Sequence, residues 1–480
     1  MAAIPANGAF DDGYARRGLL VPLSGLMAAQ FAAAMSGTIV ATSIPTLMAN
    51  LEGPSSHAVW LVAATVLANT ATTPIWGKFG DIFDPRRVLL VALGIFVVGT
   101  ALAALSLSTT MLIGSRAVQG IGLGGVFSGV AIAIASLVGP RQRGRTNSWL
   151  SIMQTLAQLI APVVGGLLAA TPWLGWRWSF YLIFPIALFA FALVLFTLKL
   201  PRRTPSVHRT DYAGALLIAA TVTSLLVCAT AAAESGWSSP TTLITGSVGA
   251  VLLLATVAVE TRAADPIVPF RLLSRRTPAL VVIAAFCAGS TLFTGTVFAS
   301  QYMQYVLELN PAQSGALLVP MALAAAVAAF AAGRYMSRTA RIRPVLITGF
   351  ASMVTGASLL SAIAVAPLAL VVLGTVLVAA GLGMLLQNLV LAAQNTVLIG
   401  QVGTVSSTVL FFTTLGGTVA LVVLGAVLDG LVGAALASGA SPGEAYGSGI
   451  STVFLITTCI VTVGFVAMLA MPSTKLRSIQ

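Results

Sequence analysis

The sequence is poor in charge and in chemically reactive side chains. Charged residues make up 8% of the 480 positions and hydrophobic residues 58%, a balance that the surface of a water-soluble domain could not tolerate. With two histidines and three cysteines, the usual metal sites and hydrolase motifs are absent, and no pair of cysteines suggests a disulfide. The composition therefore favours a membrane protein over an enzyme, and we expect neither a cofactor nor a metal.

The chain has instead a series of long apolar stretches. Crossing a hydrocarbon core of about 30 Å takes roughly 20 helical residues. We predict fourteen such spans, near residues 19–46, 58–76, 88–107, 111–138, 147–170, 178–199, 212–233, 241–259, 278–305, 313–333, 344–363, 367–395, 404–433 and 451–471. The predicted fold class is an all-α membrane protein with 14 transmembrane helices.

Basic residues recur in alternate gaps between these spans. Of the 24 Lys and Arg residues, 22 lie near 16–17, 78–87, 141–145, 199–209, 262–276, 334–343 and 475–477. Basic loops stay on the cytoplasmic side, so the pattern places both termini in the cytoplasm and the protein in a plasma or inner membrane. Because the net charge of +12 is spread over short loops, it indicates membrane lipids and not nucleic acid as the partner.

A weak internal repeat relates the two ends of the chain. One predicted loop begins with Gly77-Lys78 and another with Gly333-Arg334, and both end in bases before a new span. Transporters are commonly built from such repeats, with the substrate held between them near the midplane. We predict an N-terminal six-helix half at 1–199, two additional helices with linkers at 200–277, and a C-terminal six-helix half at 278–480.

Short motifs carry a resemblance to a known family. Gly77-Lys78-Phe79-Gly80-Asp81, followed by Asp84, Arg86 and Arg87, is similar to the G-x-x-x-D-x-x-x-R-[RK] signature of the major facilitator superfamily. Further similar segments are Thr38-Ile39-Val40 with Ala41 to Pro45, Arg116-Ala117-Val118-Gln119-Gly120, Pro162-Val163-Val164-Gly165-Gly166, and Trp176-Arg177-Trp178-Ser179-Phe180. With fourteen spans, the chain resembles the 14-helix drug:proton antiporter branch, which implies two six-helix bundles plus two extra central helices.

The resemblance implies a cytoplasmic gate in the first motif. The resemblance implies that Asp81 holds the two halves together on the cytoplasmic side, with Arg86 and Arg87 as its partners. Gly77 and Gly80 imply a tight turn with close approach of the backbone. The residues alone leave open a second interpretation, in which Asp81 is a solvated loop charge.

Arg116 and a glycine-rich bend are the candidates for coupling. Arg116 is the one base predicted inside a span, which costs about 2.5–3.5 kcal/mol on insertion scales and marks a functional hypothesis. Gln119 lies one turn away and could share its hydrogen bonds, for conformational or proton coupling or for helix pairing. We also expect that Pro162, Gly165 and Gly166 bend the fifth span, a motif that the family associates with antiport, although Ala161 replaces its leading glycine.

The first span departs from the family pattern. Related exporters usually carry an aspartate where this chain has Ser36, and serine cannot titrate. The remaining acids near spans are Asp429, which we take as the coupling candidate, and Glu308. Both lie near external helix ends, so each could simply be solvated.

Uncharged polar side chains inside the spans are the candidates for a substrate cavity. Amides in lipid need partners, so we expect them to face the bundle interior, where they could bind substrate or hold helices together. The predicted cavity residues are Met35, Ser36, Asn69, Gln154, Gln158, Gln301, Gln304, Gln387 and Gln394.

The sequence predicts a monomeric exporter of small amphipathic compounds that works by alternating access and uses protons. Because no carboxylate stands at Ser36 to attract a cation, we expect neutral or weakly anionic substrates. Two alternatives remain open: a proton-independent facilitator or lipid or metabolite exporter, and a non-transporting membrane sensor or scaffold.

Overall fold

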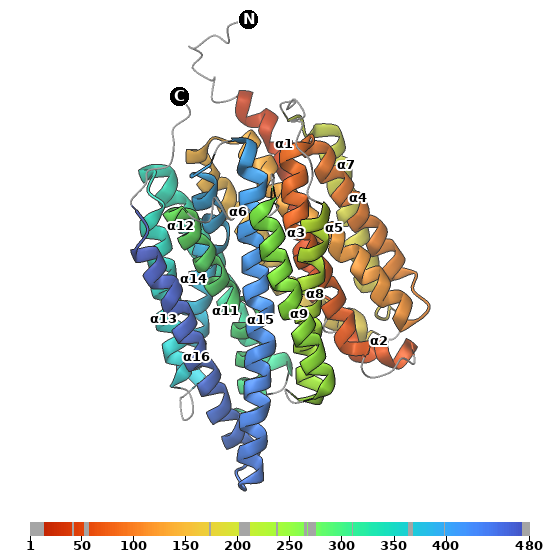
Figure 1. Cartoon of the computed structure of the whole chain (residues 1–480), viewed down its shortest axis with the longest axis vertical. Helices are drawn as coiled ribbons and strands as arrows, with labels where there is room; N and C mark the ends of the chain where they lie inside the picture. Colours follow the sequence, from red (N-terminus) through yellow and green to blue (C-terminus); the bar gives the residue numbers. More distant parts are fainter. Residues whose placement is uncertain are drawn as a thin grey trace, which may run out of the picture.

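The computed structural model describes residues 14–40, 43–51, 57–171, 174–200, 212–236, 239–263, 266, 275–309, 311–362, 368–397 and 399–472, which are almost entirely helical (Figure 1). The N-terminal helices are α1 (Tyr14–Thr38), α2 (Ile44–Leu51), α3 (His57–Ile82), α4 (Pro85–Ala104), α5 (Thr109–Leu137), α6 (Pro140–Ala170) and α7 (Trp178–Thr197). A central pair follows, α8 (Tyr212–Ser235) and α9 (Pro240–Arg262). The C-terminal helices are α11 (Arg276–Tyr305), α12 (Pro311–Thr339), α13 (Arg343–Ser361), α14 (Leu368–Gln394), α15 (Val402–Ala437) and α16 (Pro442–Leu469).

Several helices begin and end at residues that satisfy the exposed backbone groups there. Asp84, Ser108, Ser239 and Ser441 cap α4, α5, α9 and α16 by accepting a hydrogen bond from a first-turn N–H. After α15, Gly439 has a φ of +90°, a backbone conformation that favours glycine. Local sequence therefore sets these boundaries independently of hydropathy.

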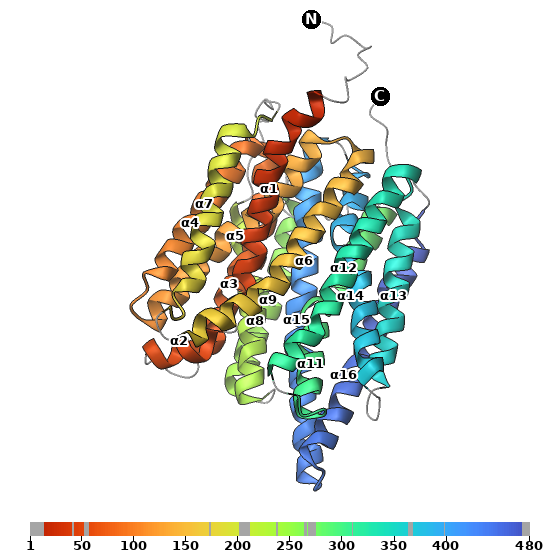
Figure 2. The same cartoon turned by 180° about the vertical axis from the view of Figure 1, so that it is seen from behind.

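Buried apolar residues form two large clusters, one in each half of the chain. The first joins α1, α3, α4, α5, α6 and α7 around residues such as Leu26, Phe96 and Phe180. The second joins α11 to α16 around residues such as Phe350 and Phe454. Two helical bundles therefore lie side by side, as the red-to-yellow and green-to-blue ribbons show in Figure 2.

The central pair covers one side of the seam between the bundles. Leu67 of α3, Ile218 and Val222 of α8, and Phe411 of α15 form a small apolar cluster. α9 packs on α8 and exposes large apolar side chains such as Leu254 on its outer face. α8 therefore contacts both bundles, while α9 presents a surface suited to lipid.

Eleven helices within the described residues are long and apolar enough to span a membrane: α1, α4, α5, α7, α9 and α11 to α16. α3 and α6 are not among them, and both carry polar residues in mid-helix. The polar stretches of α3 and α6 lie along the two seams, where α3 packs on α15 and α6 on α12. The more polar helices thus line the interface between the bundles.

Several predicted span boundaries were wrong. The first span ends at Thr38 and is followed by the separate helix α2, α6 begins at Pro140, and α16 begins at Pro442. The segment from Gly77 to Asp81, predicted as a loop, forms the last turns of α3. Hydropathy marks the part of a helix that is apolar, whereas hydrogen bonding continues the helix through polar residues at its ends.

α15 is longer than a membrane crossing requires. Its 36 residues correspond to about 54 Å at 1.5 Å per residue, against about 30 Å of hydrocarbon. The C-terminal end of α15 and the start of α16 extend beyond the other helices at the bottom of Figure 1. At the opposite end of the molecule, α1 begins and α16 ends.

Candidate functional site

A cavity lies between the two bundles, with one wall from each. Its volume is about 100 Å³, and it is partly open to the surroundings. α6 contributes polar side chains and α11, α12 and α14 contribute apolar or small ones, and none of the lining residues carries a charge. The lining consists of Ser151, Gln154, Thr155, Gln158, Leu292, Met321, Ala322, Ala325, Ala379, Leu382, Gly383 and Leu386.

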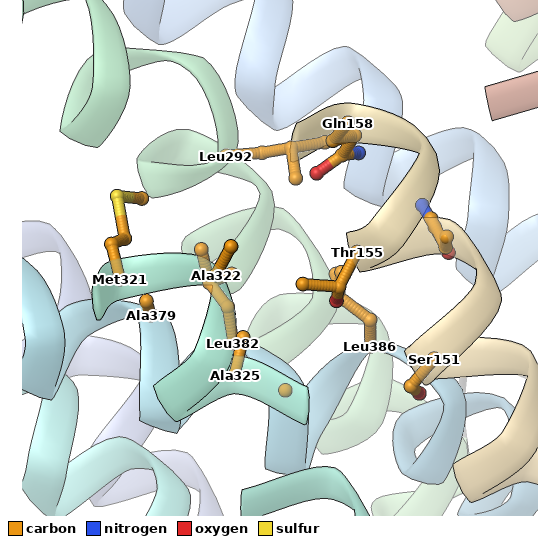
Figure 3. A pocket seen from close by; sticks show the side chains of 12 residues that line it. Ser151, Thr155, Gln158, Leu292, Met321, Ala322, Ala325, Ala379, Leu382 and Leu386 are labelled. Carbon is orange, nitrogen blue, oxygen red and sulfur yellow. The ribbon is translucent and has the colours of Figure 1, made fainter. Parts of the chain in front are cut away.

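The polar wall presents hydrogen-bonding groups on one face of α6. Figure 3 shows Thr155 and Gln158 extending from α6 toward Ala322 and Leu382 on the opposite side. Gln154 accepts a 3.4 Å hydrogen bond from the amide of Gln30 on α1, while Gln158 is exposed to the cavity. Amides and hydroxyls beside an apolar wall suit an uncharged amphipathic molecule.

Of the nine residues predicted for the cavity, Gln154 and Gln158 line it and the other seven do not. Met35 and Ser36 are buried in the N-terminal bundle. Among the amides, Asn69 accepts from the Thr73 hydroxyl, Gln304 donates to Ser300, and Gln394 donates to Ser406. The side chain of Gln387 is buried, and Gln301 lies on α11 outside the cavity lining. Helix periodicity identifies inward-facing amides but does not separate those facing a cavity from those facing a neighbouring helix.

A carboxylate joins the bundles where α3 ends and α15 begins. Asp81 accepts hydrogen bonds from the backbone N–H of Gly403 at 2.8 Å, the N–H of Thr404 at 2.6 Å and the hydroxyl of Thr404 at 2.7 Å. These N–H groups belong to the first turn of α15, the positive end of its dipole. The contact therefore ties the last turn of α3 to the C-terminal bundle.

The described contacts of Asp81 do not include Arg86 or Arg87, which the resemblance implied as its partners. Arg86 donates to the carbonyl of Leu195, and Arg87 lies 3.9 Å from Asp84. The remaining basic residue of the motif, Lys78, precedes Asp81, and its Nζ donates to the carbonyl of Pro266 at 3.5 Å. The arginines follow Asp81 in sequence but lie on α4, which turns away into the N-terminal bundle.

The internal repeat is visible in equivalent contacts of the two bundles. Arg86 donates to Leu195 near the end of α7, and Arg343 donates to Leu469 at the end of α16 at 2.6 Å. In each half, an arginine at the start of the third long helix thus caps the C-terminus of the last. Basic side chains stabilise the carbonyl end of a helix.

Two glycines allow the bundles to approach closely, one at each seam. A Cβ at Gly77 would collide with Ser407 and come within 2.6 Å of the carbonyl of Gly403. A Cβ at Gly333 would collide with Ser148 and come within 2.7 Å of the carbonyl of Gly144. Gly80 packs instead against Ile132 of its own bundle. The predicted close approach is therefore present at Gly77, and it recurs in the second half.

Arg116 lies in the interior of the N-terminal bundle. Its side chain is 1% exposed, and its Nε donates to the carbonyl of Leu61 at 3.1 Å. Nη1 donates to the carbonyl of Ser36 at 3.2 Å and to the side chain of Gln119 at 2.5 Å. Gln119 in turn donates to the hydroxyl of Thr100 at 2.8 Å. The network links α1, α3, α4 and α5.

The acids predicted for coupling do not line the cavity. Asp429 is exposed on the extension of α15, and Glu308 follows the end of α11 with a φ of +52°. Sequence reasoning passed over Glu260, whose side chain is 1% exposed near the end of α9. The sequence feature that could have identified Glu260 is its spacing from Thr256, which lies one turn earlier on α9. The hydroxyl of Thr256 lies 2.8 Å from the hydroxyl of Thr221 on α8. That spacing places Glu260 on the α8-facing side of an otherwise lipid-exposed helix.

The glycine-rich segment of α6 packs on the region after α1. The helix continues through Pro162 to Ala170, and the carbonyl of Gly165 accepts a 3.3 Å hydrogen bond from Ser43. The side chain of Pro162 and the environment of Gly166 lie outside the described residues. The predicted bend stays a prediction.

Two helical bundles with a cavity between them are an architecture found in membrane transporters. The chain belongs to the Major Facilitator Superfamily, whose family model matches residues 26–421. The efflux pump FUS6 of Gibberella fujikuroi is 34% identical over 332 residues, 67% of this chain and 59% of that protein. This chain thus spans less than two thirds of the length of several curated relatives that it matches.

Two further comparisons cover more of the chain. The multidrug transporter protein MdtP of Bacillus subtilis is 29% identical over 423 residues, 86% of this chain and 76% of that protein. The crystal structure of the human organic anion transporter MFSD10 (TETRAN) has a TM-score of 0.62 at 18% identity, covering 93% of this chain and 99% of that chain. The solved structure shows that the fold is shared.

Proposed function

We propose that this protein exports small amphipathic compounds, neutral or weakly anionic, by alternating access of the cavity to the two sides of the membrane. The observation that carries the proposal is the cavity itself, which lies between the bundles and has one hydrogen-bonding wall and one apolar wall. A permanent cation would find no charged partner among the lining residues. FUS6 is named an efflux pump and MdtP a multidrug transporter, and the name of FUS6 supports export as the direction of transport.

The architecture that we propose has fourteen membrane-spanning helices. Helices α3, α6 and α8 complete the eleven apolar spans, and residues 1–199 and 278–480 form the two moving halves with 200–277 between them. The basic segments near 78–87, 141–145 and 334–343 support a cytoplasmic position for the Asp81 contact and for both termini. The protein would act as a monomer in a plasma or inner membrane.

The Asp81 contact supports a gating role. Its hydrogen bonds to Gly403 and Thr404 join the bundles at the end where α3 stops. Opening that end requires these bonds to break, so the carboxylate stabilises the closed state. Arg116 and Gln119 would position α1 and α5 relative to one another during the movement.

Proton coupling is part of the proposal, and a proton-independent facilitator is the second candidate. The specific observation that favours the second is the cavity lining, which contains no acid. Ser36 also offers no titratable group beside Arg116. If transport is coupled to protons, the coupling depends on a carboxylate outside the cavity, such as Asp81 or the buried Glu260.

The test uses purified protein in liposomes, with and without an imposed pH gradient. Neutral, anionic and dicationic amphiphiles of similar size are supplied, and both substrate movement and lumenal pH are followed. We expect neutral and anionic compounds to move, with proton flux in the opposite direction. Efficient transport of the dication would contradict the proposed substrate class, whereas substrate movement without proton flux would select the facilitator.

A further inference from the structure

The guanidinium of Arg116 is a buried positive charge whose hydrogen-bond acceptors are all neutral. Nε and Nη1 use the carbonyls of Leu61 and Ser36 and the side-chain oxygen of Gln119. The effective cost of burying an ion is several kcal/mol, and neutral acceptors offset it less well than an opposite charge. The hydrogen bonds that the described residues form with Arg116 therefore do not neutralise its charge.

Two orphaned hydroxyls lie on the helices that contact this guanidinium. Ser36 Oγ and Thr65 Oγ1 are buried, with side chains 0% and 2% exposed, and neither has a hydrogen-bond partner. Ser36 is the residue whose carbonyl accepts from Arg116. Thr65 lies one turn after Leu61, and its Cα would lie 3.0 Å from a Cβ at Gly120, one turn after Arg116. Both hydroxyls are thus on the turns that surround the charge.

We propose that Arg116, Ser36 and Thr65 form a binding site for a small monovalent inorganic anion such as chloride. An anion there would accept hydrogen bonds from the guanidinium and from both hydroxyls, which satisfies the orphaned groups and neutralises the buried charge. The site is enclosed, since Arg116 is 1% exposed, so a carboxylate on a substrate-sized molecule does not reach it. Substrates in the α6 cavity and the anion would occupy separate places.

The position of the site gives the anion a structural consequence. Ser36 lies on α1, Thr65 on α3 and Arg116 on α5. A bound anion therefore joins three helices of the N-terminal bundle, and the folded state binds it while the unfolded chain does not. Such a ligand stabilises the folded protein by an amount that grows with the logarithm of its concentration once the concentration exceeds Kd.

The test measures stability, which is independent of transport. The thermal midpoint of the purified protein is recorded in sodium chloride, sodium bromide and sodium gluconate at equal ionic strength. We expect the midpoint to rise with the logarithm of the chloride or bromide concentration above Kd and not to rise with gluconate, which is too large for an enclosed site. Ser36→Ala and Thr65→Val should each weaken the apparent chloride affinity roughly tenfold, because each removes a hydrogen bond to a charged group.

Matched variants separate an anion from buried water. Thr70→Val removes another orphaned hydroxyl of α3, 0% exposed and about 140° around the helix from Thr65, and should leave the chloride affinity unchanged. Ser36→Asp places a fixed carboxylate beside Arg116 and should abolish the chloride response. If Ser36→Asp does not fold, the comparison of Thr65→Val with Thr70→Val still shows whether the chloride response depends on the hydroxyl of Thr65. Equal thermal midpoints of the wild-type protein in chloride and gluconate would overturn the proposal and would mean that the hydroxyls bind water instead of an anion.

Discussion

Thr404 donates two hydrogen bonds to the same carboxylate oxygen of Asp81, one from its backbone N–H at 2.6 Å and one from its hydroxyl at 2.7 Å. The two residues are 323 positions apart in the sequence and belong to different bundles. A carboxylate at the positive end of a helix dipole is stabilised by the unpaired N–H groups there. The link therefore depends on the negative charge and on the start of α15.

Asp81→Asn should weaken this closed contact. Loss of the charge and of one acceptor amounts to about 1–2 kcal/mol, which lowers the ratio of closed to open molecules roughly 5- to 30-fold. Spin labels at Phe83→Cys and Gln401→Cys, in a background without the native cysteines, would report longer distances. Asp84→Asn is the control, because Asp84 caps α4 within its own bundle. Identical distance distributions in Asp81→Asn and the unsubstituted background would refute the latch.

Gly77→Ala and Gly333→Ala should each separate the bundles at one seam. The added Cβ meets a side chain and a backbone carbonyl of the opposite bundle, and overpacking of this kind costs about 1–3 kcal/mol. We expect a lower thermal midpoint and slower transport for both. The control is Gly114→Ala on α5, where a Cβ meets open space. Midpoints equal to that of the control would mean that the bundles are not in close contact there.

Gln158→Leu should impair binding of substrates that form hydrogen bonds. Loss of one hydrogen bond of about 1 kcal/mol predicts a KM roughly 5-fold higher for such substrates, with little change for purely apolar ones. Gln304→Leu is the matched control, since Gln304 donates to Ser300 on its own helix and does not line the cavity. Equal changes of KM in both variants would mean that Gln158 does not contact the substrate.

Asp429→Asn should leave transport and its pH dependence unchanged. Asp429 is exposed in the C-terminal part of α15 and does not line the cavity. The measurement is substrate-driven proton flux in liposomes, compared between the variant and the wild-type protein. Loss of proton flux with folding intact would return Asp429 to the coupling pathway.

The sequence predicted the helical membrane fold because hydropathy and basic loops are local signals. Each of the fourteen predicted spans overlaps a long helix, and the repeat between Gly77 and Gly333 marks two equivalent seams. The ends of the helices were harder to predict. The starts of α6 and α16 at Pro140 and Pro442 lie in polar sequence, where capping and proline determine the boundary and hydropathy does not.

Contacts between distant residues could not be predicted from local pattern. Nothing near Asp81 in the sequence indicates that its partners are the N–H groups of Gly403 and Thr404, and the adjacent arginines suggested a different pairing. Likewise, Gln158 and Gln394 look alike in sequence, yet one faces the cavity and the other donates to Ser406. The distinction depends on how the helices are rotated against each other, which tertiary packing sets.

The most direct test of the central claim asks whether substrate occupies the cavity between α6 and α12. Ala322→Cys, in a background without the native cysteines, is labelled with a thiol reagent during transport, and Gly425→Cys on α15 serves as the control away from the cavity. We expect a transported neutral amphiphile to protect Ala322→Cys from labelling and to leave labelling of Gly425→Cys unchanged. Equal labelling of Ala322→Cys with and without a saturating substrate, while transport continues, would contradict it.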